Sequence, residues 1–156
     1  METNMKVLDW TNVPEIKIVY SAKVKASERP VIQSSGNIYS LLLSKWNLNN
    51  IELQEEFMVI YLNRANRVLG VYHASAGGID GTVADTRLIL AAALNMGASG
   101  IALSHNHPSG SLRPSRADEQ LTSNIKEAAR YHSINILDHL IITPESYYSF
   151  RDEGLL

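Results

Sequence analysis

Hydrophobic positions along the chain fall into alternations and short apolar runs that are typical of β-strands. One segment alternates isoleucine with lysine, as a half-buried strand does, and the others are short apolar runs bounded by polar or glycine-rich turns. A polar turn at residues 63–66 would join two of these runs as an antiparallel pair. The predicted strands are residues 15–20, 55–63, 67–75, 99–104 and 135–143, the last of which could form two strands.

Three other segments predict α-helices, because capping residues precede them or because they are rich in alanine and leucine. They are residues 37–46, 83–96 and 115–131, with Gly97 as the stop signal of the second and Ser115 opening the third. The elements predict an α/β (α+β) protein in which helices flank a mixed, mostly antiparallel sheet. Residues 1–30 would form an N-terminal arm and strand, and residues 31–156 the main domain.

Composition narrows the class of protein. The chain has 156 residues, of which 45% are hydrophobic and 19% charged, values that suit one folded globular domain. No apolar run is long enough to span a bilayer and no secretory signal is visible, so we expect a cytoplasmic protein that does not enter a membrane. The absence of cysteine excludes disulfides and thiolate metal sites. The formal net charge of -2 disfavours direct binding to nucleic acid.

Two histidines one residue apart leave the fourth predicted strand. Side chains at positions i and i+2 of a strand point the same way, so His105 and His107 could present both imidazoles to one metal ion. Imidazole suits zinc, but a catalytic zinc site needs a third protein ligand. Asp118 lies one turn inside the next predicted helix, and its carboxylate could supply that ligand if the intervening loop folds back.

Simpler interpretations compete with a metal site. A His-x-His pair is often structural or exposed, and Ser115 with Asp118 also matches the pattern of a capping box at a helix start. Capping and metal binding are compatible, because a cap would hold the aspartate in a fixed orientation. Glu55 and Glu56 open a strand, and alternation indicates only that one of them faces such a site. His139 lies in an apolar strand pattern and is interpreted as a hydrogen-bonded core histidine, with Asp138 as its candidate partner.

Taken together, the spacing of these residues is more specific than any one of them. The run His105-x-His107-x7-Ser115-x2-Asp118 resembles the JAMM signature of JAB/MPN+ metallopeptidase-like domains. Over about residues 30–156 the chain resembles, more narrowly, the RadC group of bacterial JAB proteins. The motifs that carry this resemblance are Gln54-Glu55-x-Phe57, His105-Asn106-His107-Pro108-Ser109-Gly110, Pro114-Ser115-Arg116-Ala117-Asp118 and Leu137-Asp138-His139-Leu140-Ile141-Ile142.

The resemblance implies a fold, an activity and a set of residue roles. The fold would be the JAB/MPN (cytidine-deaminase-like) sandwich. His105, His107 and Asp118 would bind one Zn2+, Glu55 would be the general base toward a metal-activated water, and Ser115 would hydrogen-bond the oxyanion. The activity would be hydrolysis of a peptide or isopeptide bond in an unknown protein or peptide substrate.

The same resemblance supplies an alternative function of a different class. The RadC group carries a DNA-repair label, so the domain could be an accessory module of DNA repair with a structural or non-catalytic metal site. A pure protein-interaction domain is a third possibility, which the intact set of ligands disfavours. Neither the substrate nor the oligomeric state follows from the sequence.

Overall fold

The computed structural model describes residues 11, 13–15, 17, 20–77 and 84–156. Its strands are β1 (Glu56–Leu62), β2 (Val68–Ala76), β3 (Gly100–Asn106), β4 (Asn135–Ile142) and β5 (Tyr147–Ser149). Its helices are α1 (Ser35–Lys45), α2 (Thr86–Asn95), α3 (Arg116–Arg130) and the short 3-10 helix η1 (Ala26–Glu28). No helix in the described part of the chain is both long and apolar enough to cross a membrane.

The strands form one mixed sheet in the order β2-β1-β3-β4-β5. β1 pairs antiparallel with both β2 and β3, β4 pairs antiparallel with β5, and the β3–β4 pair is parallel. The parallel pair follows from the connection through α3, because parallel neighbours need a crossover rather than a hairpin. The predicted α+β class and the mostly antiparallel sheet are confirmed.

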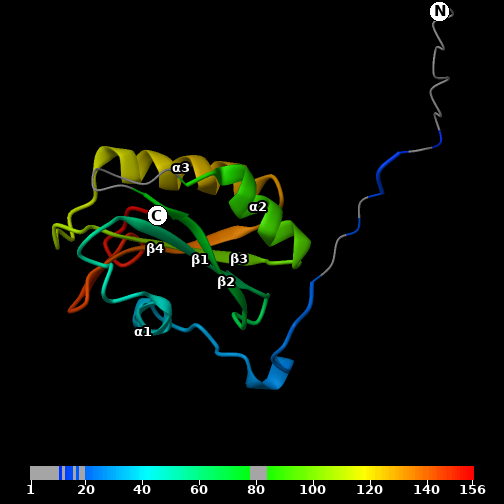
Figure 1. The fold of residues 1–156 in the computed structure, drawn as a ribbon, viewed down its shortest axis with the longest axis horizontal. Coiled ribbons are helices and arrows are strands. Elements are labelled where there is room, and N and C mark those ends of the chain that lie inside the picture. The colour runs from blue at the N-terminus through cyan, green and yellow to red at the C-terminus, as the bar shows by residue number, and fades with distance from the viewer. Residues whose placement is uncertain (1–10, 12, 16, 18–19, 78–83) are drawn as a thin grey trace, which may run out of the picture.

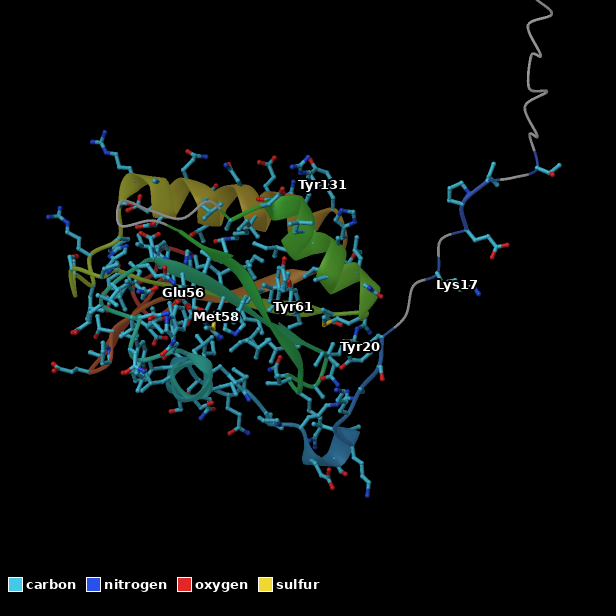
Figure 2. The ribbon with its side chains drawn as sticks, viewed as in Figure 1. Lys17, Tyr20, Glu56, Met58, Tyr61 and Tyr131 are labelled. Atoms are coloured by element: carbon cyan, nitrogen blue, oxygen red, sulfur yellow. The ribbon has the colours of Figure 1, made fainter. Side chains whose placement is uncertain are left out.

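Helices cover both faces of the sheet, with α2 and α3 on one side and α1 on the other (Figure 1). Phe57, Val59 and Tyr61 of β1 belong to the core beneath α2 and α3, whereas Met58 and Ile60 belong to the core beneath α1. Every residue of β1 and β3 is buried, because both faces of these central strands are covered. Figure 2 shows Met58 and Tyr61 within the layers, while Tyr131 lies at the outer surface after α3.

Most predicted elements are present with small shifts of their ends. The antiparallel pair β1–β2 and all three helices are found, and Gly97 follows α2 with a positive φ of 66°, as a helix stop requires. β5 was not predicted, since three residues after a proline turn show no measurable periodicity. Of the predicted strand 15–20, the described residues Glu15, Lys17 and Tyr20 lie in no strand, and residues 1–10 of the predicted arm fall outside the described residues.

One correction bears directly on the site. The predicted strand 99–104 ends too early, because β3 continues through Asn106 before the loop begins. His105 pairs with Phe57 of β1 and with Ile141 of β4, and both it and Asn106 are buried. The strand was predicted to end at residue 104 because His105 and Asn106 are polar. In the structure their side chains are buried and form hydrogen bonds inside the fold, so these polar residues are not exposed.

Asn106 fastens β3 to the segment that enters β1. Its side-chain oxygen accepts from the backbone nitrogen of Glu56 at 2.7 Å. Its amide nitrogen donates to the carbonyls of Ile51 and Gln54 at 2.6 and 2.9 Å. The side chain thus satisfies three backbone groups and fixes residues 51–56 beside the end of β3.

We expect Asn106→Ala to lower the free energy of unfolding by about 3 kcal/mol, because it leaves buried backbone groups without partners. Urea denaturation followed by circular dichroism measures this loss. Asn124→Ala on the exposed face of α3 is the matched control and should change stability by no more than about 0.5 kcal/mol. Equal effects of the two substitutions would contradict this role of Asn106.

Candidate metal centre

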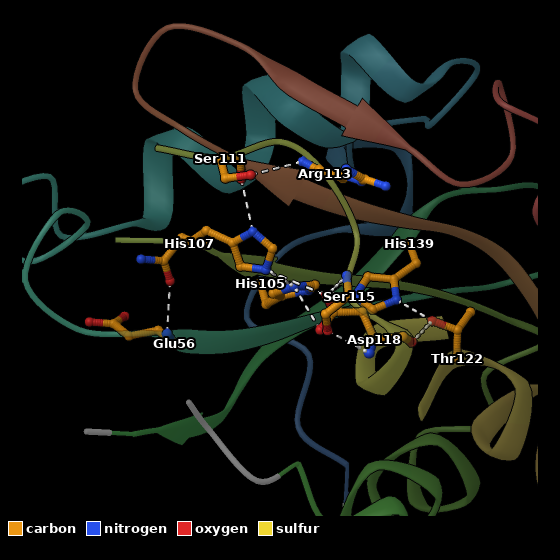
Figure 3. A network of polar contacts seen from close by, with 10 residues as sticks. Glu56, His105, His107, Ser111, Arg113, Ser115, Asp118, Thr122 and His139 are labelled. Carbon is orange, nitrogen blue, oxygen red and sulfur yellow. Dashed lines mark hydrogen bonds and ion pairs between the residues drawn. The ribbon is translucent and has the colours of Figure 1, made fainter. Parts of the chain in front are cut away.

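The candidate site lies where β3 ends, in front of the first turn of α3 (Figure 3). His105 is the next-to-last residue of β3 and is 1% exposed, while His107 follows the strand and is partly exposed. Their Nε2 atoms are 3.0 Å apart. The two imidazoles therefore converge, as the alternation of side chains along a strand predicted. The ring of His105 lies within the sheet, and the ring of His107 lies at its edge.

Asp118 reaches the two imidazoles from the start of α3. Its Oδ1 atom is 3.3 Å from Nε2 of His105, and its Oδ2 atom is 3.5 Å from Nε2 of His107. The ligand atoms that the three residues offer all lie within 4.8 Å of one another. The loop between β3 and α3 does fold back as the sequence analysis required, and the three predicted metal ligands are brought together.

The capping interpretation is also correct, and it explains how Asp118 is held. Ser115 is the N-cap of α3, its Oγ accepting from the backbone nitrogen of Asp118 at 3.2 Å. In return, the backbone nitrogen of Ser115 donates to Oδ2 of Asp118 at 2.6 Å. This capping box orients the carboxylate, so helix capping and convergence on the histidines are served by the same residue.

The separations are those of groups that could share one metal ion. Ligand atoms about 2.05 Å from a zinc ion at tetrahedral angles lie about 3.3 Å from each other. The two Nε2 atoms are 3.0 Å apart, and Asp118 approaches them at 3.3 and 3.5 Å through different carboxylate oxygens. The three residues therefore lie close enough together to act as ligands of one ion.

The protonation of His107 also favours a metal. Its Nδ1 is 2.8 Å from the carbonyl oxygen of Ser111. A carbonyl only accepts, so Nδ1 must carry the hydrogen, and in the neutral ring Nε2 then holds the lone pair. That lone pair faces His105 and Asp118, where a cation can use it.

Electrostatics at the site attract positive charge. The hydrogen bond with Asp118 raises the pKa of His107 against the opposing effect of burial, and the charge of Glu55 contributes. Burial alone would raise the pKa of Asp118, but hydrogen bonds with His105 and His107 outweigh it and hold that pKa well below its usual range. Without a metal, a proton on His107 supplies part of the positive charge that Asp118 attracts.

The two candidate glutamates lie on opposite faces of the sheet. Glu56 begins β1, is 8% exposed, and its carboxylate accepts from the Gln54 side chain at 3.2 Å. Figure 3 shows that carboxylate directed away from the imidazoles. Glu55 precedes β1 on the face that Phe57 shares with His105, and its charge acts on His107. The alternation therefore separates the two, and Glu55 is the one on the side of the site.

Ser115 is exposed at the mouth of the site. Its oxygen is used as an acceptor by the cap, so the hydroxyl hydrogen stays free of that bond and can point elsewhere. Its place one turn before Asp118 puts it beside the third ligand.

The burial of His139 is confirmed, but its predicted pairing with Asp138 is found only at the backbone, where Oδ1 of Asp138 accepts from the backbone nitrogen of His139 at 2.8 Å. Asp138 and His139 are neighbours on β4 and point to opposite faces, so their side chains cannot pair. Asp138 instead accepts from Oγ of Ser149 at 2.7 Å and from the backbone nitrogen of Arg151 at 3.1 Å. His139 is fully buried and its Nε2 lies 2.8 Å from Nδ1 of His105.

Thr122, for which the sequence predicted no role, contacts the other ring nitrogen of His139. Its Oγ1 lies 2.6 Å from Nδ1 of His139 and donates to the carbonyl of Asp118, also at 2.6 Å. Within a helix, a threonine commonly donates to the carbonyl of the residue four positions earlier, so the hydrogen bond from Thr122 to Asp118 could have been predicted from the sequence. The contact between Thr122 of α3 and His139 of β4 depends on tertiary packing and could not.

Comparison with known proteins agrees with this geometry. The family model described as the RadC-like JAB domain matches residues 32–155. A UPF0758 protein of Flavobacterium johnsoniae is 52% identical over 101 residues, covering 65% of this chain and 44% of that protein. A UPF0758 protein of Porphyromonas gingivalis is 46% identical over 104 residues, covering 66% of this chain and 46% of that protein. UPF0758 protein YfjY of Escherichia coli is 39% identical over 103 residues, covering 66% of this chain and 64% of that protein.

A helix-flanked mixed sheet with this His-His-Asp group at the end of a central strand is the architecture of a JAB-type domain. The chain belongs to the RadC-like JAB family. It matches less than half the length of the first two relatives.

We expect the purified protein to bind one equivalent of zinc, and His107→Ala to weaken that binding on the order of 100-fold or more, since even residues that only orient metal ligands contribute 10–100-fold. Zinc content by plasma mass spectrometry and calorimetric titration measure both. His132→Ala is the matched control, because His132 is exposed beyond the far end of α3. Failure of the wild-type protein to bind zinc, or an equal loss in the control, would contradict the site.

Proposed function

We propose that this domain is a zinc-dependent hydrolase that cleaves a peptide or isopeptide bond in a protein or peptide substrate. The observation that carries the proposal is the convergence of His105, His107 and Asp118 within reach of one ion, with Glu55 on the same side of the sheet. Nitrogen and carboxylate ligands with an open fourth position are typical of catalytic zinc sites. Membership of the RadC-like JAB family supports a hydrolase of this kind.

Bound zinc would supply Lewis acidity, lowering the pKa of water to about 7 and polarising the scissile carbonyl. The protein's own part begins with holding the three ligands. His105 is fixed in the sheet, and the capping box fixes Asp118, so little reorganisation is needed when the ion arrives.

Glu55 is the proposed general base. It would accept the proton of the attacking water and then deliver it to the leaving amine, so that the carboxylate is regenerated. The support for this role is its position on the face of Phe57 and His105 and the effect of its charge on His107. The Asn106 clamp on residues 51–56 would keep this carboxylate at a constant distance from the ligands.

Ser115 is the proposed oxyanion donor. Its oxygen accepts from the backbone of Asp118, which leaves the hydroxyl hydrogen available for the negative charge that develops on the substrate carbonyl. A donor of this kind typically contributes ~2.7–4 kcal/mol to the transition state. The cap would restrict the rotation of the side chain and so hold the donor ready.

The alternative is a DNA-repair accessory module with a non-catalytic metal site. It needs the same three ligands but assigns no role to Glu55. The formal net charge of -2 does not favour direct contact with phosphates. The two functions therefore predict different effects of removing the Glu55 carboxylate, because only the hydrolase needs it.

We expect Glu55→Gln to reduce cleavage by about 10²–10⁴-fold while zinc stoichiometry stays at one, because the amide cannot accept a proton. The substrates are a proteome-derived peptide library and a library of lysine-branched isopeptides, with new amino termini read by mass spectrometry. Glu56→Gln is the matched control, since Glu56 is adjacent in sequence and lies on the other face.

Two outcomes would reject the proposal. Zinc-loaded wild-type protein that cleaves neither library would favour a non-catalytic metal module. Cleavage that is equal in Glu55→Gln and wild type would remove Glu55 as the general base.

A further inference from the structure

The ligand His105 makes contacts that extend well behind the candidate metal centre. Its Nδ1 is 2.8 Å from Nε2 of His139, and the other nitrogen of that ring is 2.6 Å from Oγ1 of Thr122. The Thr122 hydroxyl also lies 2.6 Å from the carbonyl oxygen of Asp118. The chain of contacts thus begins at one ligand and ends on the backbone of another (Figure 3).

The last contact in this chain fixes the direction of every hydrogen bond in it. A carbonyl oxygen cannot donate, so the single hydrogen of the Thr122 hydroxyl points to Asp118. Thr122 must then accept from His139, which places the hydrogen of that ring on Nδ1. Reversing the direction would leave two oxygen lone pairs facing each other at 2.6 Å.

The same reasoning continues to the metal ligand. His139 is fully buried, and its two ring nitrogens contact the Thr122 hydroxyl and the His105 imidazole, neither of which is an anion, so the ring is neutral. A neutral ring with its hydrogen on Nδ1 offers only a lone pair at Nε2. His105 must therefore donate from its Nδ1, and its own lone pair lies on Nε2, the atom that faces His107 and Asp118.

Among the described residues, His105 and Thr122 are the hydrogen-bond partners of the His139 ring nitrogens. The residue is 0% exposed, and its ring stacks on Phe150 with a centroid distance of 4.7 Å. Phe57 meets it edge-on at 5.6 Å. Thr122 is 4% exposed. Water therefore cannot replace either hydrogen bond without opening the core.

From this geometry we propose that His139 and Thr122 are positioning residues that fix the tautomer and ring orientation of His105, so that its Nε2 is presented as a metal ligand. The inference rests on the proposed metal site and deepens it. Ligating histidines commonly donate their second nitrogen to a carboxylate or carbonyl. Here a neutral imidazole takes that place, and it accepts because a threonine hydroxyl behind it has already fixed its own hydrogen.

The arrangement also couples two ligands. The carboxylate of Asp118 faces Nε2 of His105, while the backbone carbonyl of Asp118 sets, through Thr122 and His139, which nitrogen of His105 holds the hydrogen. The first turn of α3 thus orients its own ligand and the ligand in β3. A displacement of that turn would disturb both together.

The test compares Thr122→Val, which keeps the shape but removes the hydroxyl, with Thr122→Ser, which restores it. We expect Thr122→Val to weaken zinc binding about 10–100-fold and Thr122→Ser to bind within about threefold of wild type. Calorimetric titration with zinc measures the affinity, and urea denaturation of the metal-free variants reports any loss of folding separately.

A second readout needs neither metal nor substrate. Nitrogen-15 spectra of the metal-free imidazoles, recorded at alkaline pH, should show the hydrogens of His105 and His139 on Nδ1 in wild type and Thr122→Ser. In Thr122→Val the Nδ1 tautomer should lose population in both rings, which a purely structural role of Thr122 would not cause.

The inference is overturned if wild-type His105 carries its hydrogen on Nε2, or if Thr122→Val keeps both the wild-type tautomers and the wild-type zinc affinity. These results are independent of the proposed hydrolysis, since an inactive protein with the expected tautomers and affinities would reject the enzyme and keep the positioning role.

Discussion

Three electron-pair donors converge on one point at the end of a central strand, and their mutual repulsion is the constraint around which the rest of the site is built. Nε2 of His105, Nε2 of His107 and the carboxylate of Asp118 are separated by only 3.0–3.5 Å. Such a group is stable only with positive charge between its members. A proton or a single metal ion shared by the three groups could supply that charge, and several independent contacts in the fold keep the donors in place.

Each donor is held by a different part of the fold. His105 is held by the sheet and by His139 behind it, His107 by the carbonyl of Ser111, and Asp118 by the capping box with Ser115. The Asn106 clamp then fixes the segment that carries Glu55 beside them. Because these restraints come from the sheet, the loop and α3 separately, the site is preorganised by the architecture and not by one flexible loop.

Much of this arrangement was predictable from local patterns. Alternation predicted the β1–β2 pair, the serine and aspartate spacing predicted the start of α3, and the His-x-His spacing predicted convergent imidazoles. What failed were the inferences that needed knowledge of tertiary contacts. The polar residues at 105–106 indicated a loop because nothing in the sequence shows that Asn106 satisfies three backbone groups inside the fold. Asp138 was assigned to His139 because sequence neighbours were considered together, although adjacent strand residues face opposite ways. The separation of Glu55 from Glu56 required the face that Phe57 occupies.

The most direct measurement of the central claim is a crystal structure of the zinc-soaked protein with data collected on both sides of the zinc absorption edge. The account predicts one anomalous peak about 2.0–2.2 Å from Nε2 of His105, Nε2 of His107 and one carboxylate oxygen of Asp118. It also predicts that Nδ1 of His105 stays within hydrogen-bonding distance of His139. An anomalous peak elsewhere, or an imidazole pair that turns away from Asp118 when zinc is supplied, would contradict the account.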